Sequence, residues 1–148
     1  KDDFLSKIED YLPDKITSLP LYSKERLSKI KTILLERITL LSDIKTLAEA
    51  GEFDYFFDLP QVDSQMLKNT KYLSALADLL EKIPANNFTP EEIKKAIWDF
   101  ATQAGRSDVL WPFRVALSGR EKSPDPFIIA AVIGKKETLA RVKTASIL

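Results

Sequence analysis

Cysteine and histidine are both absent from the 148 residues. The absence of cysteine excludes disulfides and thiol nucleophiles, and the absence of histidine excludes imidazole acid–base chemistry. Together they exclude a structural zinc site of the Cys/His kind. An enzyme built from this sequence would depend on carboxylates or lysines, and no spacing singles out two acids that converge on a pocket. A cysteine-free composition suits the cytosol, so we expect a cytoplasmic protein.

Glycine is scarce, and long apolar runs are missing. Four glycines leave little room for a glycine-rich loop that binds phosphate. No apolar run approaches the roughly 20 residues that span a membrane, so we expect no membrane partner. The charged start, Lys1-Asp2-Asp3, is not typical of a signal peptide. The first residue is not Met, which favours a piece excised from a longer protein.

The residues that are present indicate a globular protein with an uneven charge. Hydrophobic residues make up 45% and charged residues 30%, and the net charge is zero. From residue 101 onward eight basic residues face four acidic ones, so this segment carries +4 and the first hundred residues −4. The basic third fits an anionic partner such as RNA. The same charge counts also fit a mildly polar surface that binds no anion.

The apolar residues recur at helical spacing throughout, and the strict alternation of a β-strand is missing. The fold class we expect is therefore all-α. The clearest helix start is Thr89-Pro90-Glu91-Glu92, where a capping hydroxyl precedes a proline and two carboxylates. Helices are expected at 4–12, after Ser23, from Ser42 or Asp43 to Gly51, near 53–57, and at 65–83, 90–104, 109–118, 126–133 and 136–144.

Two small subdomains are expected, with a connector at residues 61–64 between them. The first comprises residues 1–62 and ends with the aromatic cluster Phe53 to Phe57, which we expect to fill a core. The second comprises residues 63–148. Trp98, Trp111 and Phe113 are predicted to be core residues of the second subdomain rather than surfaces for bases.

The loop that precedes Phe127 carries the most informative chemistry. Residues 123–127 read Ser-Pro-Asp-Pro-Phe, and two prolines in four residues stiffen the loop. Arg114, Arg120 and Lys122 flank it. Stacking of an unpaired base contributes about 1–3 kcal/mol, and cations hold the phosphates. This pattern predicts contact with single-stranded RNA, with Arg120 and Lys122 as candidate phosphate contacts.

Positions 110–142 read LWPFRVALSGREKSPDPFIIAAVIGKKETLARV. This run resembles the C-terminal signature of bacterial-type glutamyl-tRNA synthetases: a hydrophobic-Pro-hydrophobic-Arg-x-Ala-Leu-[Ser/Thr]-Gly segment, a Ser/Thr-Pro pair, and a helix that ends Leu/Ile-Gly-Lys-Glu. Upstream, residues 36–41 and Phe56-Phe57 resemble the preceding subdomain of that family. The sequence departs from one version of the pattern at Glu121 and Pro126, where apolar residues occur.

The resemblance implies a helical region of a class I aminoacyl-tRNA synthetase that binds the anticodon loop of tRNA(Glu). The parent enzyme would attach glutamate to the tRNA with ATP and Mg. The histidine-containing signature of its catalytic domain is not found in this chain. We therefore expect no catalytic residue, cofactor or metal site here, no binding of DNA, and a monomer.

The resemblance also assigns residues to bases. Positions equivalent to Arg114, Ser123, Pro126 and Phe127 contact the first two anticodon bases. A position corresponding to Arg37 recognises the third, which is C for glutamate and G for glutamine. A guanidinium only donates hydrogen bonds, whereas the pairing edge of cytosine offers two adjacent acceptors and that of guanine two donors. Arg37 would then favour C and disfavour G.

Each of these residues also has a structural interpretation, and both interpretations stay open. Arg37 lies near a helix end, where solvated cations are common. Arg114 could satisfy carbonyls or pair with a carboxylate, and Ser123 or Asp125 could cap a helix. Phe127 could be the first buried residue of that helix.

The sequence leaves two alternatives to anticodon recognition of tRNA(Glu). A helical adaptor would bind a protein partner through an apolar groove, with little sensitivity to salt, whereas RNA binding weakens steeply as salt rises. A non-discriminating synthetase would keep the family but also charge tRNA(Gln), and Arg37 argues against it.

Overall fold

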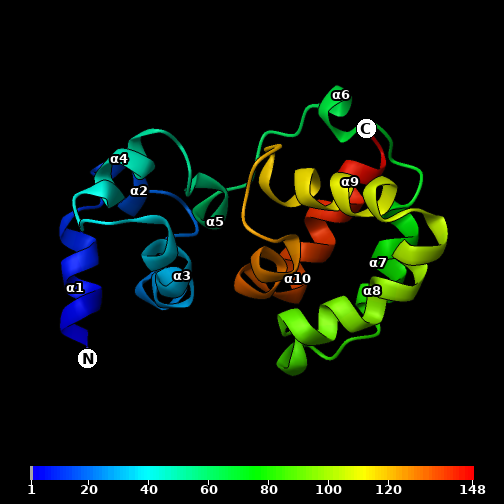
Figure 1. The fold of residues 1–148 in the computed structure, drawn as a ribbon, viewed down its shortest axis with the longest axis horizontal. Helices are drawn as coiled ribbons and strands as arrows, with labels where there is room; N and C mark the ends of the chain where they lie inside the picture. Colours follow the sequence, from blue (N-terminus) through cyan, green and yellow to red (C-terminus); the bar gives the residue numbers. More distant parts are fainter. Residues whose placement is uncertain (1) are drawn as a thin grey trace. The chain divides into compact units, whose positions relative to one another are not determined.

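The computed structural model describes residues 2–148, with side chains from residue 4 onward. Within this range every regular element is helical, which confirms the all-α prediction (Figure 1). The elements are α1 Asp2–Asp10, α2 Asp14–Thr17, α3 Lys24–Arg37, α4 Asp43–Glu49, α5 Asp54–Phe57, α6 Ser64–Leu67, α7 Leu73–Glu81, the 3₁₀ helix η1 Ala85–Asn87, α8 Pro90–Ala104, α9 Arg106–Ser118 and α10 Pro126–Ser146. None of the described helices is long and apolar enough to cross a membrane.

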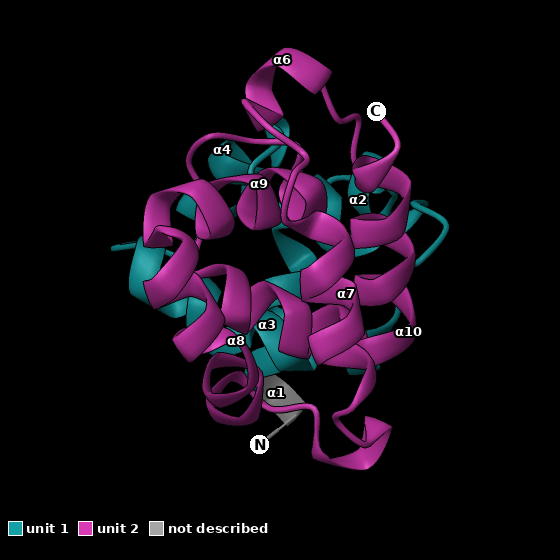
Figure 2. Ribbon diagram, turned by 90° about the vertical axis from the view of Figure 1, so that its right-hand side faces the viewer, with its two compact units in different colours: residues 1–59 teal, residues 60–148 magenta. Residues whose placement is uncertain are grey.

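The chain divides into two compact units, residues 1–59 and 60–148 (Figure 2). The division falls between residues 59 and 60, whereas the sequence predicts it between residues 62 and 63. Leu59-Pro60 therefore separates the units, and the expected connector at 61–64 belongs to the second.

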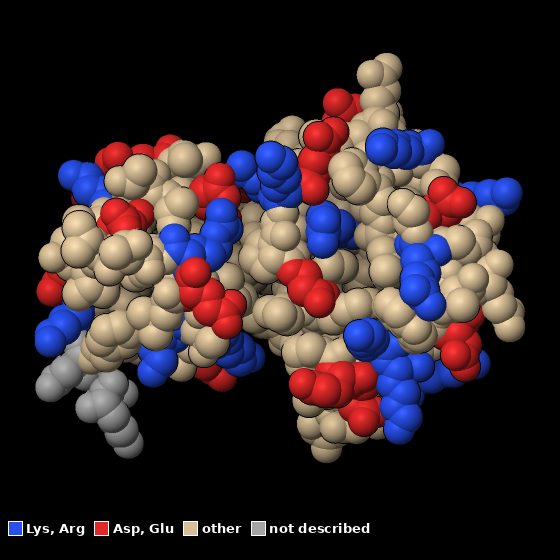
Figure 3. Space-filling view, viewed as in Figure 1, with Lys and Arg blue, Asp and Glu red and all other residues tan. Residues whose placement is uncertain are grey.

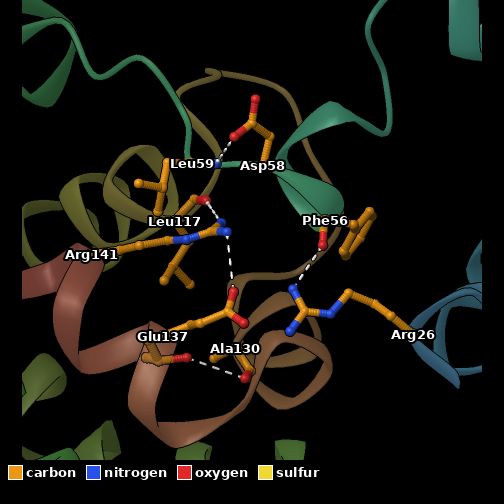
Figure 4. Close-up of polar contacts among 9 residues, drawn as sticks. Arg26, Phe56, Asp58, Leu59, Leu117, Ala130, Glu137 and Arg141 are labelled. Atoms are coloured by element: carbon orange, nitrogen blue, oxygen red, sulfur yellow. Dashed lines mark hydrogen bonds and ion pairs between the residues drawn. The ribbon is translucent and has the colours of Figure 1, made fainter. Parts of the chain in front are cut away.

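Unit 1 is built from α1 to α5 around an apolar core. The aromatic cluster fills part of this core as predicted, since Phe53, Phe56 and Phe57 are each at most 1% exposed. Ser23 caps α3, because its hydroxyl oxygen accepts from the backbone N–H of Arg26 at 3.0 Å. The Arg26 side chain in turn donates to the carbonyl of Phe56 at 2.9 Å, which ties α3 to α5 (Figure 4).

Unit 2 is built around α10, which packs against α7, α8 and α9. Thr89 caps α8 as predicted: its hydroxyl accepts from the N–H of Glu92 at 3.2 Å, and Pro90 occupies the first turn. Gly105, at φ +113°, ends α8, and α9 begins at the next residue. The two helices are therefore joined without a loop, and α9 starts three residues before the predicted 109.

The predicted single helix over residues 65–83 is wrong. Two helices, α6 and α7, occupy this segment, and residues 68–72 separate them. Lys68 adopts a positive φ of 68°, which right-handed helices exclude. The Asn69 side chain then accepts from the N–H of Lys71 at 3.1 Å, a local bond that competes with helix formation. Apolar periodicity could not detect this interruption, because leucines stand on both sides of it.

The two last predicted helices form one element, α10, with a break where the sequence places it. Gly134 has φ 89° and ψ 168°, a non-helical conformation open essentially to glycine. On the two sides of Gly134 the backbone is helical, and Thr138 donates its hydroxyl to the Ala130 carbonyl across the break at 3.2 Å. This bond satisfies one carbonyl that the interrupted ladder leaves free.

Candidate nucleic-acid interface

A cleft of about 550 Å³ opens in unit 2 between α8, α9 and the start of α10. Arg114 from α9 lines it together with Pro126 and Phe127 from the first turn of α10. These are three of the four residues that the sequence assigns to the first two bases. Ser123 does not line the cleft; its hydroxyl donates to the Pro124 carbonyl at 2.8 Å.

The turn after α9 is organised by Ser118 and Gly119. The Ser118 hydroxyl donates to the Arg114 carbonyl at 2.8 Å and accepts from the N–H of Arg120 at 3.1 Å. Gly119 takes the left-handed conformation, with φ 70°, and closes the helix through its N–H to the Val115 carbonyl at 2.7 Å. The chain thus leaves α9 in a sharp turn that begins one helical turn after Arg114.

Asp125, one of the two predicted caps, starts α10. Its carboxylate accepts from the N–H of Phe127 at 2.8 Å, and Pro126 follows it in the first turn. Phe127 is 6% exposed, and its ring centroid lies 6.3 Å from that of Phe113. The structural interpretation of Phe127 is therefore correct for most of its ring, while the remainder lines the cleft.

Arg114 is half-buried and holds an unsatisfied donor. Its Nε is buried and has no hydrogen-bond partner among the described residues. An unmade hydrogen bond of a buried group costs about 1–3 kcal/mol, and native proteins keep few such groups. The structural interpretation, in which carbonyls or a carboxylate satisfy this arginine, does not account for Nε. Arg114 also lines the cleft.

Arg141 connects the end of α9 to the second half of α10. It is only 4% exposed; Nη1 donates to the Leu117 carbonyl at 2.7 Å, and Nη2 lies 3.4 Å from Glu137 (Figure 4). The last carbonyls of a helix lack intrahelical donors, so a cation there satisfies both the hydrogen bond and the helix dipole. Arg141 therefore fixes the end of the helix that carries Arg114.

Arg37 ends α3 in unit 1 and is exposed. Its Nη2 lies 2.8 Å from Oε1 of Glu52, so the structure adds an ion pair to the solvated helix end that the sequence suggests. The next loop is held by Asp43, whose carboxylate accepts from the N–H of Leu40 at 3.0 Å and of Thr39 at 2.9 Å. These bonds hold the pKa of the Asp43 carboxyl below its usual range.

Comparison with known proteins bears directly on these surfaces. The family model described as "Anticodon binding domain" matches residues 3–146. The chain belongs to this family. The C-terminal anticodon-binding region of glutamate–tRNA ligases is thus its homologue, which confirms the resemblance of residues 110–142.

Relatives of this anticodon-binding domain are longer. Glutamate–tRNA ligase of Flavobacterium johnsoniae is 30% identical over 151 residues, covering 97% of this chain and 28% of that protein. The ligase of Clostridium kluyveri is 33% identical over 126 residues, or 78% of this chain and 25% of the relative. The crystal structure of glutamate–tRNA synthetase from Elizabethkingia anophelis superposes with a TM-score of 0.73 at 26% identity, covering 99% of this chain and 28% of that one. The domain therefore spans between a quarter and three tenths of these proteins.

Two tryptophans of the domain lie at the cleft, and the sequence did not predict them there. Trp98 and Trp111 are half-buried and line it, whereas both were expected in the core; Phe113 is fully buried as predicted. The Trp111 indole N–H donates to the Met66 carbonyl at 2.7 Å, a bond to the separated α6 that periodicity could not anticipate. The Lys94-x-x-x-Trp98 spacing was an available signal, since residues four apart meet on a helix.

Basic and acidic side chains lie side by side on the face of the domain drawn in Figure 3. Of the two candidate phosphate contacts, Lys122 is exposed and Arg120 is half-buried. On the face drawn, the basic residues therefore do not form a surface of one charge.

Proposed function

We propose that this anticodon-binding domain binds the anticodon loop of tRNA(Glu) and recognises its bases, while other parts of a glutamate–tRNA ligase attach glutamate with ATP and Mg. The observation that carries the proposal is that one cleft is lined by Arg114, Pro126 and Phe127, three of the residues expected to contact the anticodon. The named relatives, all glutamate–tRNA ligases, support the choice of tRNA.

The chemistry of the cleft suits an unpaired base. Arg114 offers donors in a plane, and the edge of a base offers acceptors. Pro126 and the exposed part of Phe127 give an apolar wall, and bases stack on such surfaces. Ser123 lies on the adjoining loop and is proposed to contact the same bases, while Arg120 and Lys122 are proposed to contact the phosphates.

Arg37 is proposed to recognise the third anticodon base. Its guanidinium lies at the end of α3 and keeps donors beyond the one directed at Glu52. The pairing edge of cytosine offers two adjacent acceptors to such donors, whereas that of guanine presents two donors, so the domain favours the glutamate anticodon over the glutamine one. The domain is proposed to act in the cytoplasm as a monomer and to supply no catalytic residue, cofactor site or metal site of its own.

Fluorescence anisotropy of a labelled tRNA(Glu) anticodon stem-loop tests the proposal. We expect saturable binding that weakens as salt rises, since released counterions drive RNA binding. Arg114→Ala should weaken binding at least about tenfold, because hydrogen bonds to charged groups contribute about 1.5–3 kcal/mol. Lys15→Ala, which removes an exposed cation from α2, is the matched control. Absence of binding at low salt contradicts the proposal, and salt-insensitive binding contradicts an RNA interface.

A second series replaces the third anticodon base by G. The stem-loop with C should bind more tightly, and Arg37→Ala should abolish the difference. Equal affinities for C and G in the unmodified domain would instead indicate a non-discriminating synthetase.

A further inference from the structure

We propose that Lys94, Trp98 and Arg106 form a second nucleotide subsite in the same cleft, in which an unpaired base stacks on the Trp98 indole. The two cations hold the phosphate of that nucleotide. The inference rests on the proposed anticodon-loop function and adds to it a stacking position outside the residues assigned to the anticodon bases.

The first evidence is the arrangement of the three side chains. Lys94 and Trp98 lie one helical turn apart on α8, and Arg106 opens α9 directly after Gly105. Lys94 Nζ lies 4.8 Å from the centroid of the indole, and Arg106 Cζ lies 4.8 Å from the same centroid. One ring thus gathers two cations from two helices, within the roughly 6 Å at which cations are attracted to aromatic faces.

The second evidence is that both cations are free to leave the ring. Lys94 and Arg106 are exposed, and within the described part of the chain neither has an ion pair. The one hydrogen bond of the Arg106 side chain is a long one, 3.4 Å from Nε to the Thr102 hydroxyl. At exposed sites a cation–aromatic contact contributes only about as much as a weak ion pair. An incoming base can therefore take the place of one cation, which then binds the phosphate.

The third evidence is the position of the subsite. Trp98 lines the same cleft as Arg114, Pro126 and Phe127. A cleft of about 550 Å³ is within the range of pockets that hold small molecules and exceeds the needs of a single base. Among the described residues that line it Asp125 is the only acid, and its carboxylate accepts from the N–H of Phe127. The phosphate backbone of a bound RNA can therefore extend from Arg114 to Trp98, and Asp125 is the one carboxylate that it would pass.

Trp98 could instead only cover the core, without contacting RNA. Substitutions distinguish this packing role from base stacking by their effect on stem-loop affinity. Trp98→Leu keeps apolar bulk but removes the aromatic face, and Trp98→Phe keeps the face. If Trp98 only packs, both variants bind the anticodon stem-loop like the unmodified domain. If it stacks a base, Leu should lower the affinity at least about fivefold while Phe retains most of it. Urea unfolding, followed by the remaining Trp111, checks that both variants are folded.

Fluorescence gives a second readout that packing alone does not change. In a Trp111→Phe background the only indole is that of Trp98. Stacking of a base should quench its emission, with saturation at the dissociation constant measured by anisotropy. Unchanged emission at saturating stem-loop would overturn the inference.

Stem-loops with one abasic nucleotide identify the stacked base. At one loop position the loss of the base should make Trp98→Leu and the unmodified domain bind equally. If the difference persists at every loop position, or if Trp98→Leu binds like the unmodified domain, the subsite is overturned while the anticodon-loop function stands. No binding by the unmodified domain contradicts the proposed function itself, and this inference with it.

Discussion

Arg37 and Glu52 form an ion pair in which Nη2 lies 2.8 Å from Oε1. The pair links the last turn of α3 to the segment after α4, and 33% of the arginine side chain and 23% of the glutamate side chain remain exposed. The carboxylate of Glu52 thus holds one donor of the residue proposed to recognise a base, and its charge repels the phosphates of an incoming anticodon. We therefore expect the pair to lower the affinity for the anticodon, in addition to linking the two segments.

Glu52→Gln should strengthen binding of the anticodon stem-loop with C in the third position by about two- to fivefold, since exposed pairs contribute about 0.2–1 kcal/mol. The substitution removes both the competing charge and an anion that repels phosphates. Anisotropy titration measures the change, and Glu49→Gln, an exposed glutamate at the end of α4, is the control. A weaker affinity in Glu52→Gln would mean that Glu52 instead orients Arg37 for the base.

The loop after Arg37 should loosen in acid. Asp43 accepts from the N–H groups of Leu40 and Thr39, and these bonds lower its pKa in the folded protein. A lowered folded pKa gives a contribution that is present above the unfolded pKa and is lost as pH falls through the folded value. Hydrogen exchange followed by NMR should show the two amides becoming less protected at acid pH. Asp43→Asn should expose them at neutral pH, whereas Asp10→Asn should not.

Arg141→Met should destabilise unit 2 by about 2–3 kcal/mol. The substitution leaves the Leu117 carbonyl and Glu137 without their buried cation, and unpaired buried groups are costly. Urea unfolding followed by tryptophan emission reports unit 2, because Trp98 and Trp111 both lie there. Lys143→Met, on the same helix with a side chain 62% exposed, should change stability by less than about 0.5 kcal/mol. Similar values for the two variants would refute a structural role for Arg141.

Gly119→Ala should cost at least about 1–2 kcal/mol. The left-handed conformation disfavours a Cβ, and the Cβ would lie 2.6 Å from the backbone oxygen of Gln61. Gly134→Ala tests a conformational cost without a close contact, since a Cβ there meets nothing within 4 Å, and the cost should be larger than that of the left-handed conformation because the backbone at Gly134 is open essentially to glycine. Urea midpoints measure both. A Gly119→Ala domain as stable as the unmodified one would show that the turn after α9 can shift without cost.

The sequence predicts those elements whose signals are local. Thr89-Pro90 and Gly105 bound α8 as expected, because a capping hydroxyl, an N-terminal proline and a terminating glycine act within a few residues. The helix over 65–83 was wrong because its break depends on the positive φ of Lys68 and on a side-chain bond of Asn69. A lysine with positive φ has no recognisable signature in the sequence.

For this protein the sequence alone determined the all-helical class, the family and the identity of the cleft residues Arg114, Pro126 and Phe127. Helical periodicity and a contiguous signature are properties of neighbouring residues, so one chain suffices to reveal them. Only the tertiary structure decided that Trp98 lies at the cleft, that Nε of Arg114 is buried without a partner among the described residues, and that Glu52 pairs with Arg37. Burial and pairing depend on side chains that are distant in sequence, and an amphipathic helix does not specify which of its border residues a neighbouring helix leaves exposed.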